Sequence, residues 1–562
     1  MLSPLTTLTP LTHVSHRSDA ITVAQAFDES ARRWADKPFL CTLPETAAIY
    51  GVPSGEQTYR EIQEKIAALR SAYAAAGYGH GHRVGLLLEN RPAFFYHWFA
   101  LNALGVSVVP INADLRAAEL EYLLGHSEII LAVALRERHA DLLAAAHVAG
   151  RTLAVMMDGD AVVPASCVAP LADQPVGALS ECALLYTSGT TGRPKGCVLQ
   201  NRYFLHAGLW YAGIGGLASL EPGVERMLTP LPLVHMNAMA YSTLAMVLTG
   251  GCLIVLDRFH PGTWWDSVRQ SRASVVHYLG VMPAMLMKAA SAPTDRAHAV
   301  RFGFGAGIDR SLHADFERRF GFYLLEAWAM TETGAGAVVI ANHEPRWPGT
   351  SCFGREAADV QVRLVADDGT DVNEATPDVP GELWVRHAGE DPKYGFFSHY
   401  LKDPEATQEA WAGGWFHTGD IVRRGPDGAL HFIDRRKNVI RRSGENISAV
   451  EVESVLLQHE LVRAAAVCAV PDAIRGDEVF ACVVAPATGN TPEAQSLAAR
   501  QLTDWCLSRL AYYKAPGYIA FVESLPMTAS QKIQRGALRD LPSTLLGGPH
   551  CFDMTALKKR QG

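Results

Sequence analysis

Near the N-terminus, strand-like and helix-like segments follow one another, and this order constrains the fold more than any other feature of the chain. Residues 58–77 carry apolar side chains at three- to four-residue spacing and end in glycine, which predicts an amphipathic helix. Residues 83–90 are typical of a buried strand, residues 93–105 of a helix and residues 106–112 of a second strand. The order strand, helix, strand indicates a parallel sheet covered by helices, so we predict an α/β fold.

Two changes of pattern further along the chain indicate additional units. The alternation of strand and helix returns over residues 251–281, but residues 354–386 contain short strand-like runs broken by Asp, Gly and Pro. After residue 448, helices are expected over residues 450–458 and 493–510, with two strands between them. We therefore expect a large domain of helix-covered sheets with a β-rich subdomain, followed by a small α+β domain.

The composition is that of a globular enzyme. A chain of 562 residues is long enough for roughly two to four domains, and its 48% apolar and 19% charged residues argue against disorder. A net charge of −8 without a basic cluster gives no reason to expect a nucleic-acid partner. The ten cysteines form no CxxC pair, which argues against a zinc site and a disulfide framework.

The same sequence favours a cytoplasmic location. No apolar run approaches the roughly 20 residues that cross a bilayer, and the N-terminus has no basic start followed by an apolar segment. We therefore expect no integral membrane association.

The loop 188–196, SGTTGRPKG, has the composition of a phosphate-binding loop without the spacing of the common GxxxxGK[ST] loop, which opens a helix. Pro194 precedes Lys195 and Gly196 follows it, so no regular helix is expected to begin at this lysine. We interpret the segment as a flap whose glycines allow close backbone approach and whose hydroxyl and ammonium groups donate to phosphate. A flexible surface turn is the alternative. The predicted flap residues are Thr187, Ser188, Gly189, Thr190, Thr191, Gly192 and Lys195.

Five stretches of the chain resemble, in order, the signatures of the acyl-adenylate-forming superfamily, which includes acyl-CoA synthetases, firefly luciferase and the adenylation domains of peptide synthetases. They are residues 186–196, 327–334, 413–420, 434–448 and 528–538, and the likeness runs from about Ala24 onward. Within the superfamily, residues 317–333 and 432–456 look most like carnitine and crotonobetaine CoA ligases, a likeness that does not carry over the substrate.

The resemblance implies an AMP-forming acid–thiol ligase that uses ATP, Mg²⁺ and coenzyme A. It divides the chain into an adenylation domain, residues 1–436, and a mobile C-terminal domain, residues 437–562, with a hinge near Lys437. It also implies a role for individual residues. Lys532 neutralises charge between the carboxylate and the α-phosphate, Glu332 binds Mg²⁺, and Thr331 lies near the α-phosphate. Trp328 flanks the adenine, Gly305, Ala306 and Gly307 line the adenine and acyl pockets, Asp420 and Arg435 contact the ribose, and Gly444 faces the pantetheine tunnel.

Each of these residues also has a structural interpretation. Thr331 and Glu332 could cap a helix, Asp420 could belong to an Asp turn, and Lys532 could be an ordinary surface lysine. The basic run around Arg435 could be a solvated face, although its Arg441 or Arg442 could instead meet coenzyme phosphates.

The segment around His235 is expected to meet the acid substrate. In amino-acid-activating relatives, an aspartate at that point binds the amino group of the substrate. No acidic residue replaces it here, which argues against an amino acid as the substrate. We expect a carboxylic acid with an apolar body, medium-chain, branched or aryl, or a betaine, which points toward fatty acid metabolism. The alternative for His235 is an interior histidine. Apolar lining or core is expected from Met236, Met239, Tyr278, Val281 and Met282.

Coenzyme A is the expected acceptor of the acyl group. A stand-alone ligase that loads a carrier protein is the alternative, and oxygen is the least favoured acceptor. A catalytically silent nucleotide-binding protein is also considered, although the charged site residues are all present. The oligomeric state is open, with a homodimer as one option.

Overall fold

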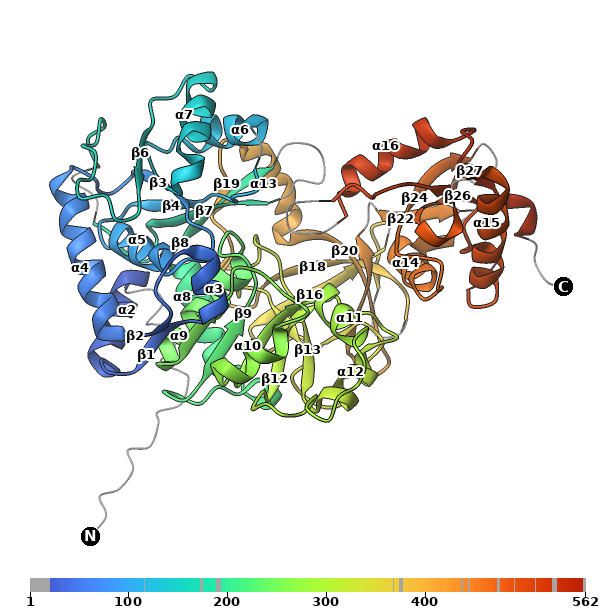
Figure 1. The fold of residues 1–562 in the computed structure, drawn as a ribbon, viewed down its shortest axis with the longest axis horizontal. Helices are drawn as coiled ribbons and strands as arrows, with labels where there is room; N and C mark the ends of the chain where they lie inside the picture. The colour runs from blue at the N-terminus through green and yellow to red at the C-terminus, as the bar shows by residue number, and fades with distance from the viewer. Residues whose placement is uncertain are drawn as a thin grey trace, which may run out of the picture.

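The computed structural model describes residues 21–115, 117–171, 175–187, 194–366, 368–372, 378–435, 438–442, 445–472, 476–489, 491–510, 512–527 and 533–558. The chain forms two large sheets, a smaller antiparallel sheet and a separate C-terminal unit (Figure 1). Among the described residues, no helix is both long and apolar enough to cross a membrane.

Both large sheets are parallel in their central part, which confirms the predicted α/β class. The eight-stranded sheet has the order β14 (Val339–Ile340), β13 (Tyr323–Trp328), β12 (Phe302–Ala306), β11 (Val275–Leu279), β9 (Arg226–Thr229), β10 (Cys252–Val255), β1 (Pro38–Thr42) and β2 (Gly55–Thr58). The seven-stranded sheet has the order β19 (His399–Tyr400), β8 (Lys195–Gln200), β7 (Glu181–Thr187), β4 (Ser107–Pro110), β3 (Arg83–Leu87), β5 (Leu131–Ala134) and β6 (Ala154–Met157). Inner strands such as β4, β5 and β10 are fully buried, as expected for parallel strands that are covered on both faces.

Helices cover the two sheets in separate layers (Figure 1). Helices α5 (Pro92–Asn102), α8 (Asn201–Gly213) and α9 (Thr243–Thr249) share one hydrophobic cluster with strands of both sheets and lie between them. Helices α6 (Ala117–Ser127) and α7 (His139–Val148) pack on the other face of the seven-stranded sheet. The remaining helices of this region are α2 (Val23–Arg33), α3 (Pro44–Tyr50), α4 (Tyr59–Ala75), α10 (Trp264–Ser271), α11 (Val281–Met287), α12 (His313–Phe320) and α13 (Pro404–Ala410).

The helix predicted over residues 58–77 illustrates how local sequence sets these elements. Helix α4 begins after Thr58, whose side chain accepts a hydrogen bond from the Glu61 amide while the Glu61 side chain accepts one from the Thr58 amide. This reciprocal capping box satisfies two of the amides that a helix N-terminus leaves without partners. Ile62, Ile66 and Tyr73 are then buried along one face.

The predicted β-rich subdomain is an antiparallel sheet of six strands. In spatial order these are β15 (Cys352–Gly354), β21 (Leu430–Arg435), β20 (Phe416–Arg424), β18 (Gly381–His387), β16 (Val360–Val365) and β17 (Asp371–Val372).

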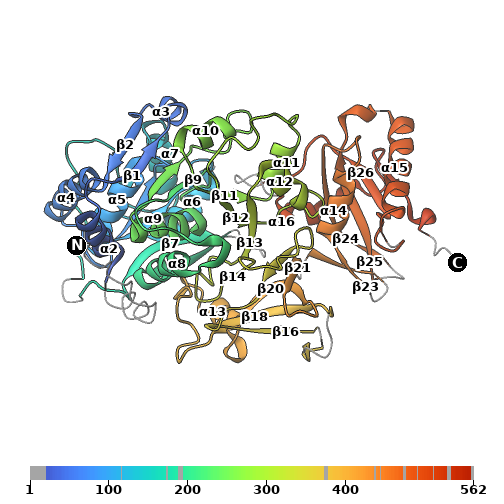
Figure 2. The same ribbon diagram turned by 90° about the horizontal axis from the view of Figure 1, so that it is seen from below.

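The C-terminal unit is α+β, as expected, and has its own hydrophobic core (Figures 1 and 2). Among the described residues, the buried hydrophobic residues of the larger body end at Leu430 and those of the C-terminal unit begin at Ile440. The predicted boundary at residues 436 and 437 falls between these two positions, but Lys437 lies outside the described residues, so the hinge stays a prediction. The unit contains β22 (Val439–Arg442), β23 (Glu445–Ser448), α14 (Ala449–Leu457), β24 (Ala464–Asp472), β25 (Gly476–Val484), α15 (Pro492–Leu507), β26 (Tyr518–Phe521), α16 (Arg535–Leu545) and β27 (Cys551–Asp553).

The topology brings the predicted site segments to one edge of the eight-stranded sheet. Because β9, β11, β12 and β13 run parallel, their carboxyl ends meet at the same edge, where ligands bind in open α/β sheets. The segments that follow these strands contain His235, Gly280, Gly307 and Glu332.

Candidate active site

Glu332 lies in the loop after β13, and its carboxylate is buried next to β19. Its Oε1 accepts a 2.9 Å hydrogen bond from the Tyr400 hydroxyl, and the Tyr400 ring centroid lies 4.8 Å from Lys195 Nζ. Burial raises the pKa of Glu332, against the opposing effect of the Tyr400 hydrogen bond. A chain of contacts thus runs from the flap lysine to Glu332. Sequence reasoning missed Tyr400, because no local pattern connects it to a residue so far away in the chain.

Backbone hydrogen bonds hold the loop that carries Thr331 and Glu332. The Tyr203 hydroxyl donates to the Thr331 carbonyl over 2.9 Å, and the Phe397 amide donates to the Glu332 carbonyl over 2.9 Å. Gly334 has a φ of +50°, and a Cβ there would lie 2.4 Å from the Tyr203 ring. The segment is not helical, so the helix-cap interpretation of Thr331 and Glu332 is wrong.

Lys195 begins strand β8 and pairs with Thr187 at the end of β7, so the prediction that no helix begins at this lysine is confirmed. Its Nζ lies 3.9 Å from Asp403 Oδ2. The flap residues Ser188, Gly189, Thr190, Thr191 and Gly192 lie outside the described residues, and their role stays a prediction.

Asp420 and Arg435 face each other across β20 and β21, so the structure brings this predicted pair together. Asp420 Oδ2 accepts a 2.9 Å hydrogen bond from the indole nitrogen of Trp328, the predicted adenine neighbour. Asp420 Oδ1 lies 3.1 Å from Arg435 Nε in an ion pair but accepts no hydrogen bond from any described residue. Burial raises the pKa of Asp420, and the Arg435 charge opposes this effect.

A buried carboxylate that sequence reasoning missed, Glu326, fixes the predicted glycine segment. Its two oxygens accept hydrogen bonds from the amides of Gly307 and Ile308, over 3.0 and 3.1 Å, and from the Tyr278 hydroxyl, over 2.9 Å. Gly305 and Ala306 end β12, where a Cβ on Gly305 would lie 2.3 Å from the Tyr278 carbonyl oxygen. Glu326 therefore ties the ends of β11 and β12 to β13. Burial raises its pKa, against the hydrogen bonds it accepts.

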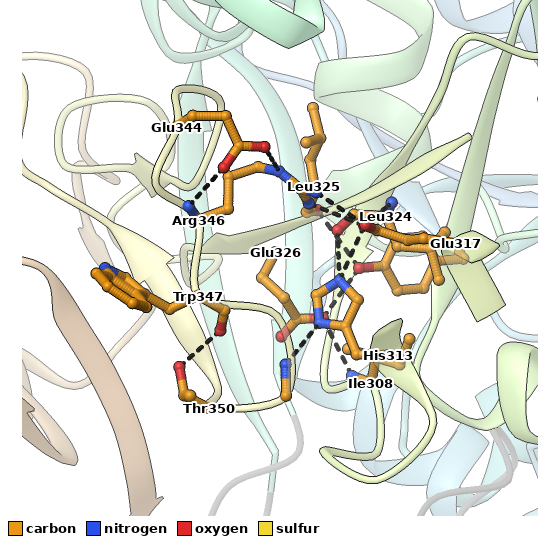
Figure 3. A network of polar contacts seen from close by, with 12 residues as sticks. Ile308, His313, Glu317, Leu324, Leu325, Glu326, Glu344, Arg346, Trp347 and Thr350 are labelled. Atoms are coloured by element: carbon orange, nitrogen blue, oxygen red, sulfur yellow. Dashed lines mark hydrogen bonds and ion pairs between the residues drawn. The ribbon is translucent and has the colours of Figure 1, made fainter. Parts of the chain in front are cut away.

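A second polar network lies next to Glu326 and braces the same strands (Figure 3). Arg346 donates two hydrogen bonds of 2.8 Å to Glu317 of α12 and a third of 3.0 Å to Glu344. His313 Nε2 lies 3.2 Å from Glu317 Oε1 and 3.0 Å from the Leu324 carbonyl oxygen. Burial by itself raises the pKa of Glu317, but the hydrogen bonds from His313 and Arg346 outweigh it and hold that pKa at about 2.

His235 is exposed, so its interpretation as an interior histidine is wrong. It precedes a π-helical turn, Asn237–Ser242, a feature often found at functional sites. Asn237 Oδ1 lies 2.7 Å from Nδ1 of buried His277, and the Tyr211 hydroxyl lies 3.0 Å from the other ring nitrogen. Burial lowers the pKa of His277 to about 3, so this ring is neutral. Of the predicted apolar lining, Met236, Met239, Tyr278 and Met282 are buried and Val281 is exposed.

In the C-terminal unit, a contact with a coenzyme phosphate was predicted for Arg441 or Arg442. Arg442 is buried and paired with Glu478, which argues against it, and the Arg441 side chain lies outside the described ones, so its contact stays a prediction. Lys532 and Gly444 lie outside the described residues, and their roles stay predictions. One hydrogen bond links the unit to the glycine segment: the Ser454 hydroxyl lies 3.1 Å from Asp309 Oδ2.

The described residues suit a magnesium nucleotide. They contain no group of three or more His, Cys, Asp or Glu side chains able to hold a metal ion. Mg²⁺ commonly uses one or two carboxylates together with substrate phosphates, which a buried Glu332 near Lys195 fits. The Asp420 oxygen that lacks a hydrogen-bond donor suits a ribose hydroxyl.

Comparison with known proteins shows the family of the chain. Residues 27–394 match a family described as AMP-binding enzyme, and residues 451–532 match the AMP-binding enzyme C-terminal domain. Crotonobetaine/carnitine–CoA ligase of Salmonella typhimurium is 29% identical over 538 residues, covering 92% of this chain and 98% of that protein. Feruloyl-CoA synthase of an Amycolatopsis species is 34% identical over 490 residues, covering 86% and 93%.

A solved structure shows the same fold. The o-succinylbenzoate coenzyme A synthetase of Bacillus subtilis, in complex with ATP and a magnesium ion, superposes with a TM-score of 0.75 at 24% identity. The match covers 92% of this chain and 99% of that one.

Proposed function

The chain belongs to the AMP-binding enzyme family, as an ATP-dependent acid–CoA ligase that acts through an acyl-AMP, and we propose that its acid has an uncharged, apolar body, with aryl acids favoured. The observation that carries the proposal is the state of Glu326. This buried carboxylate near the expected acyl pocket already accepts three hydrogen bonds.

A betaine needs an acidic or aromatic partner for its quaternary ammonium. In the described segments after β9, β11 and β12, the carboxylates before residue 310 are Asp295, which is paired with Arg319, and Asp309, whose Oδ2 lies 3.1 Å from the Ser454 hydroxyl of the C-terminal unit. The rings of Tyr211 and Tyr241 each pack on Phe304, with ring centroids 4.8 and 5.8 Å apart, so these three rings are engaged in aromatic packing. These observations favour an acid without a fixed charge on its body.

The first half-reaction follows from the charges around the β13 loop. The substrate carboxylate attacks the α-phosphate of ATP, and two anions must approach each other. Lys195 supplies positive charge to the departing pyrophosphate, and Lys532 is proposed to do so between the reacting groups. Mg²⁺ bound by Glu332 would neutralise phosphate charge. Asp420 and Arg435 hold the ribose, while Trp328 flanks the adenine and fixes the Asp420 carboxylate through its indole N–H.

The second half-reaction needs a thiol at the acyl carbonyl. We assign this to coenzyme A, with the C-terminal domain turning near Lys437 so that Gly444 faces the site and Lys532 is withdrawn. AMP then leaves and the thioester is released.

The experiment that tests the acid class is a substrate panel with MgATP and purified protein. Pyrophosphate release is measured with ferulic acid and other arylpropenoic acids, medium-chain and branched acids, crotonobetaine and carnitine. We expect kcat/KM for the best uncharged acid to exceed that for either betaine at least about a hundredfold, because an unpaired charge in an apolar site costs several kcal/mol. Preference for a betaine would reject the proposed acid class.

The same reaction then tests the acceptor. With coenzyme A added, the activated acyl group should appear as a CoA thioester, whereas a carrier protein should not be acylated at a comparable rate. Glu332→Gln serves as the inactive control, since it removes the carboxylate assigned to the metal.

A further inference from the structure

A buried ionic cluster joins the C-terminal tail to the strand that precedes Ser443 and Gly444. Glu478 on β25 has a fully buried side chain, and its Oε2 lies 2.7 Å from Nε of Arg442 at the end of β22. Its Oε1 forms an ion pair with Nζ of Lys558, whose side chain is also fully buried. The Arg442 side chain is 4% exposed. Three charges from three separated segments are thus enclosed together.

The backbone is arranged to bring Lys558 to this position. Strand β27 pairs with β26, the Met554 amide donates a 2.8 Å hydrogen bond to the Gly517 carbonyl, and a short turn at residues 555–557 follows. Gly517 is required, because a Cβ there would lie 2.5 Å from Glu478 Cγ. Residues 554–558 are therefore packed as part of the domain, with Lys558 against Glu478.

The cluster has a specific consequence for β22. Among the residues that the structure describes, that strand pairs with β25 at one position, where Arg442 lies opposite Gly476. Its other neighbour, β23, forms the second strand of the same hairpin. Within the described residues, the side-chain cluster links the end of β22 to β25 and to the C-terminal segment. Buried charges are tolerated only when they are paired, so removing one of them affects the position of the others.

We propose that Lys558 and Glu478 are positioning residues for thioester formation, because they hold Arg442, which precedes Gly444 by two positions in the chain. The inference rests on the proposed function, in which Gly444 faces the thiol in the second half-reaction. No part of the cluster belongs to the segments assigned to adenylation, so its loss should separate the two half-reactions.

The test compares Lys558→Met with the native enzyme in both half-reactions, using the best acid of the panel. Acid-dependent pyrophosphate release without CoA should stay within about twofold, while acyl-CoA formation from preformed acyl-adenylate should fall about ten- to a hundredfold, the effect of a misplacement of the order of 1 Å. Lys558→Arg should recover part of the lost rate. Lys514→Met is the matched control, since Lys514 pairs with Glu451 at 2.8 Å in the same domain without contacting the cluster.

A second variant covers the case in which Lys558→Met does not fold, as judged by its circular dichroism and thermal melt. Arg442→Lys keeps a positive charge beside Glu478 but has a shorter side chain. It should show the same selective loss of thioester formation. Equal losses in both half-reactions, or no loss in a folded variant, would overturn the inference. A native enzyme that forms acyl-adenylate but never acylates CoA would instead reject the proposed function.

Discussion

The buried carboxylates of the site differ in their neighbours, although burial raises the pKa of each. Glu332 accepts from a tyrosine hydroxyl beside Lys195, and Asp420 retains an oxygen without a hydrogen-bond donor among the described residues. Glu326 instead accepts from two backbone amides and a hydroxyl. The first two are therefore suited to bind ligands, while the third is suited to hold the walls of the pocket.

Glu326→Gln should weaken substrate binding without removing a group that touches substrate. The Tyr278 hydroxyl and the two backbone amides all donate hydrogen bonds to the Glu326 carboxylate. A glutamine has only one acceptor oxygen, and its NH₂ group would face one of these donors. An unsatisfied buried group costs roughly 1–3 kcal/mol, so we expect KM for ATP or for the acid to rise about five- to a hundredfold. Steady-state pyrophosphate release measures this effect.

Tyr278→Phe is the comparison for that variant. It removes one donor and leaves the Glu326 carboxylate with both amides, so its effect on KM should be smaller than that of Glu326→Gln. A larger effect for Tyr278→Phe would mean that the tyrosine, not the carboxylate, organises the glycine segment.

At the scale of elements, the strands around the site depend on contacts from other segments for their position. Glu326 of β13 ties this strand to the end of β12 through the Ile308 amide. Glu317 of α12 forms the ion pair with Arg346 next to the same strand (Figure 3). The pair is almost fully buried, with side chains 4% and 13% exposed. It is therefore expected to contribute more than the surface ion pairs of this protein.

The low pKa of Glu317 predicts how this contribution depends on pH. Because the pKa falls from 4.5 to about 2 on folding, the stabilisation is present in full above about pH 4.5 and is lost as the pH falls toward 2. Glu317→Gln, which resembles the protonated side chain, should lower the free energy of unfolding by roughly 3 kcal/mol at pH 7.

Urea unfolding of both proteins between pH 7 and pH 3.5 measures this difference. It should be constant above about pH 5 and shrink below pH 4.5. A difference that grew on acidification would show that the Glu317 carboxylate is not the stabilising form.

At the scale of the whole molecule, the sequence predicted the α/β class, the β-rich subdomain and the separate C-terminal unit. The predicted pairing of Asp420 with Arg435 is also present. Tyr400 and Glu326 could not be predicted, because their partners are brought together only by the sheets. Two of the hydrogen-bond donors to Glu326 are backbone amides, and a backbone amide cannot be recognised from the residue type. The burial of Arg442 was missed for a similar reason: its partner Glu478 is distant in the chain and looked like an ordinary strand residue.

The residues proposed to bind the nucleotide come from three different sheets. Lys195 belongs to the seven-stranded sheet, Trp328 to the eight-stranded sheet, and Asp420 with Arg435 to the antiparallel sheet. Bound MgATP should therefore stabilise the larger body as a unit. At a nucleotide concentration of about 100 times Kd, the expected gain is about 2.7 kcal/mol.

Asp420→Ala should abolish this stabilisation, because it removes the buried oxygens assigned to the ribose and the acceptor of the Trp328 indole N–H. Differential scanning calorimetry with and without MgATP measures the shift, and hydrogen exchange locates it. Protection should appear in residues 327–336 and 416–435 of the native protein and not in the variant. Asp371→Ala, an exposed aspartate on β17 of the same sheet, should respond like the native protein. If Asp420→Ala kept the full shift, the nucleotide would have to bind elsewhere, because no site that uses the Asp420 carboxylate could tolerate its loss without weaker binding.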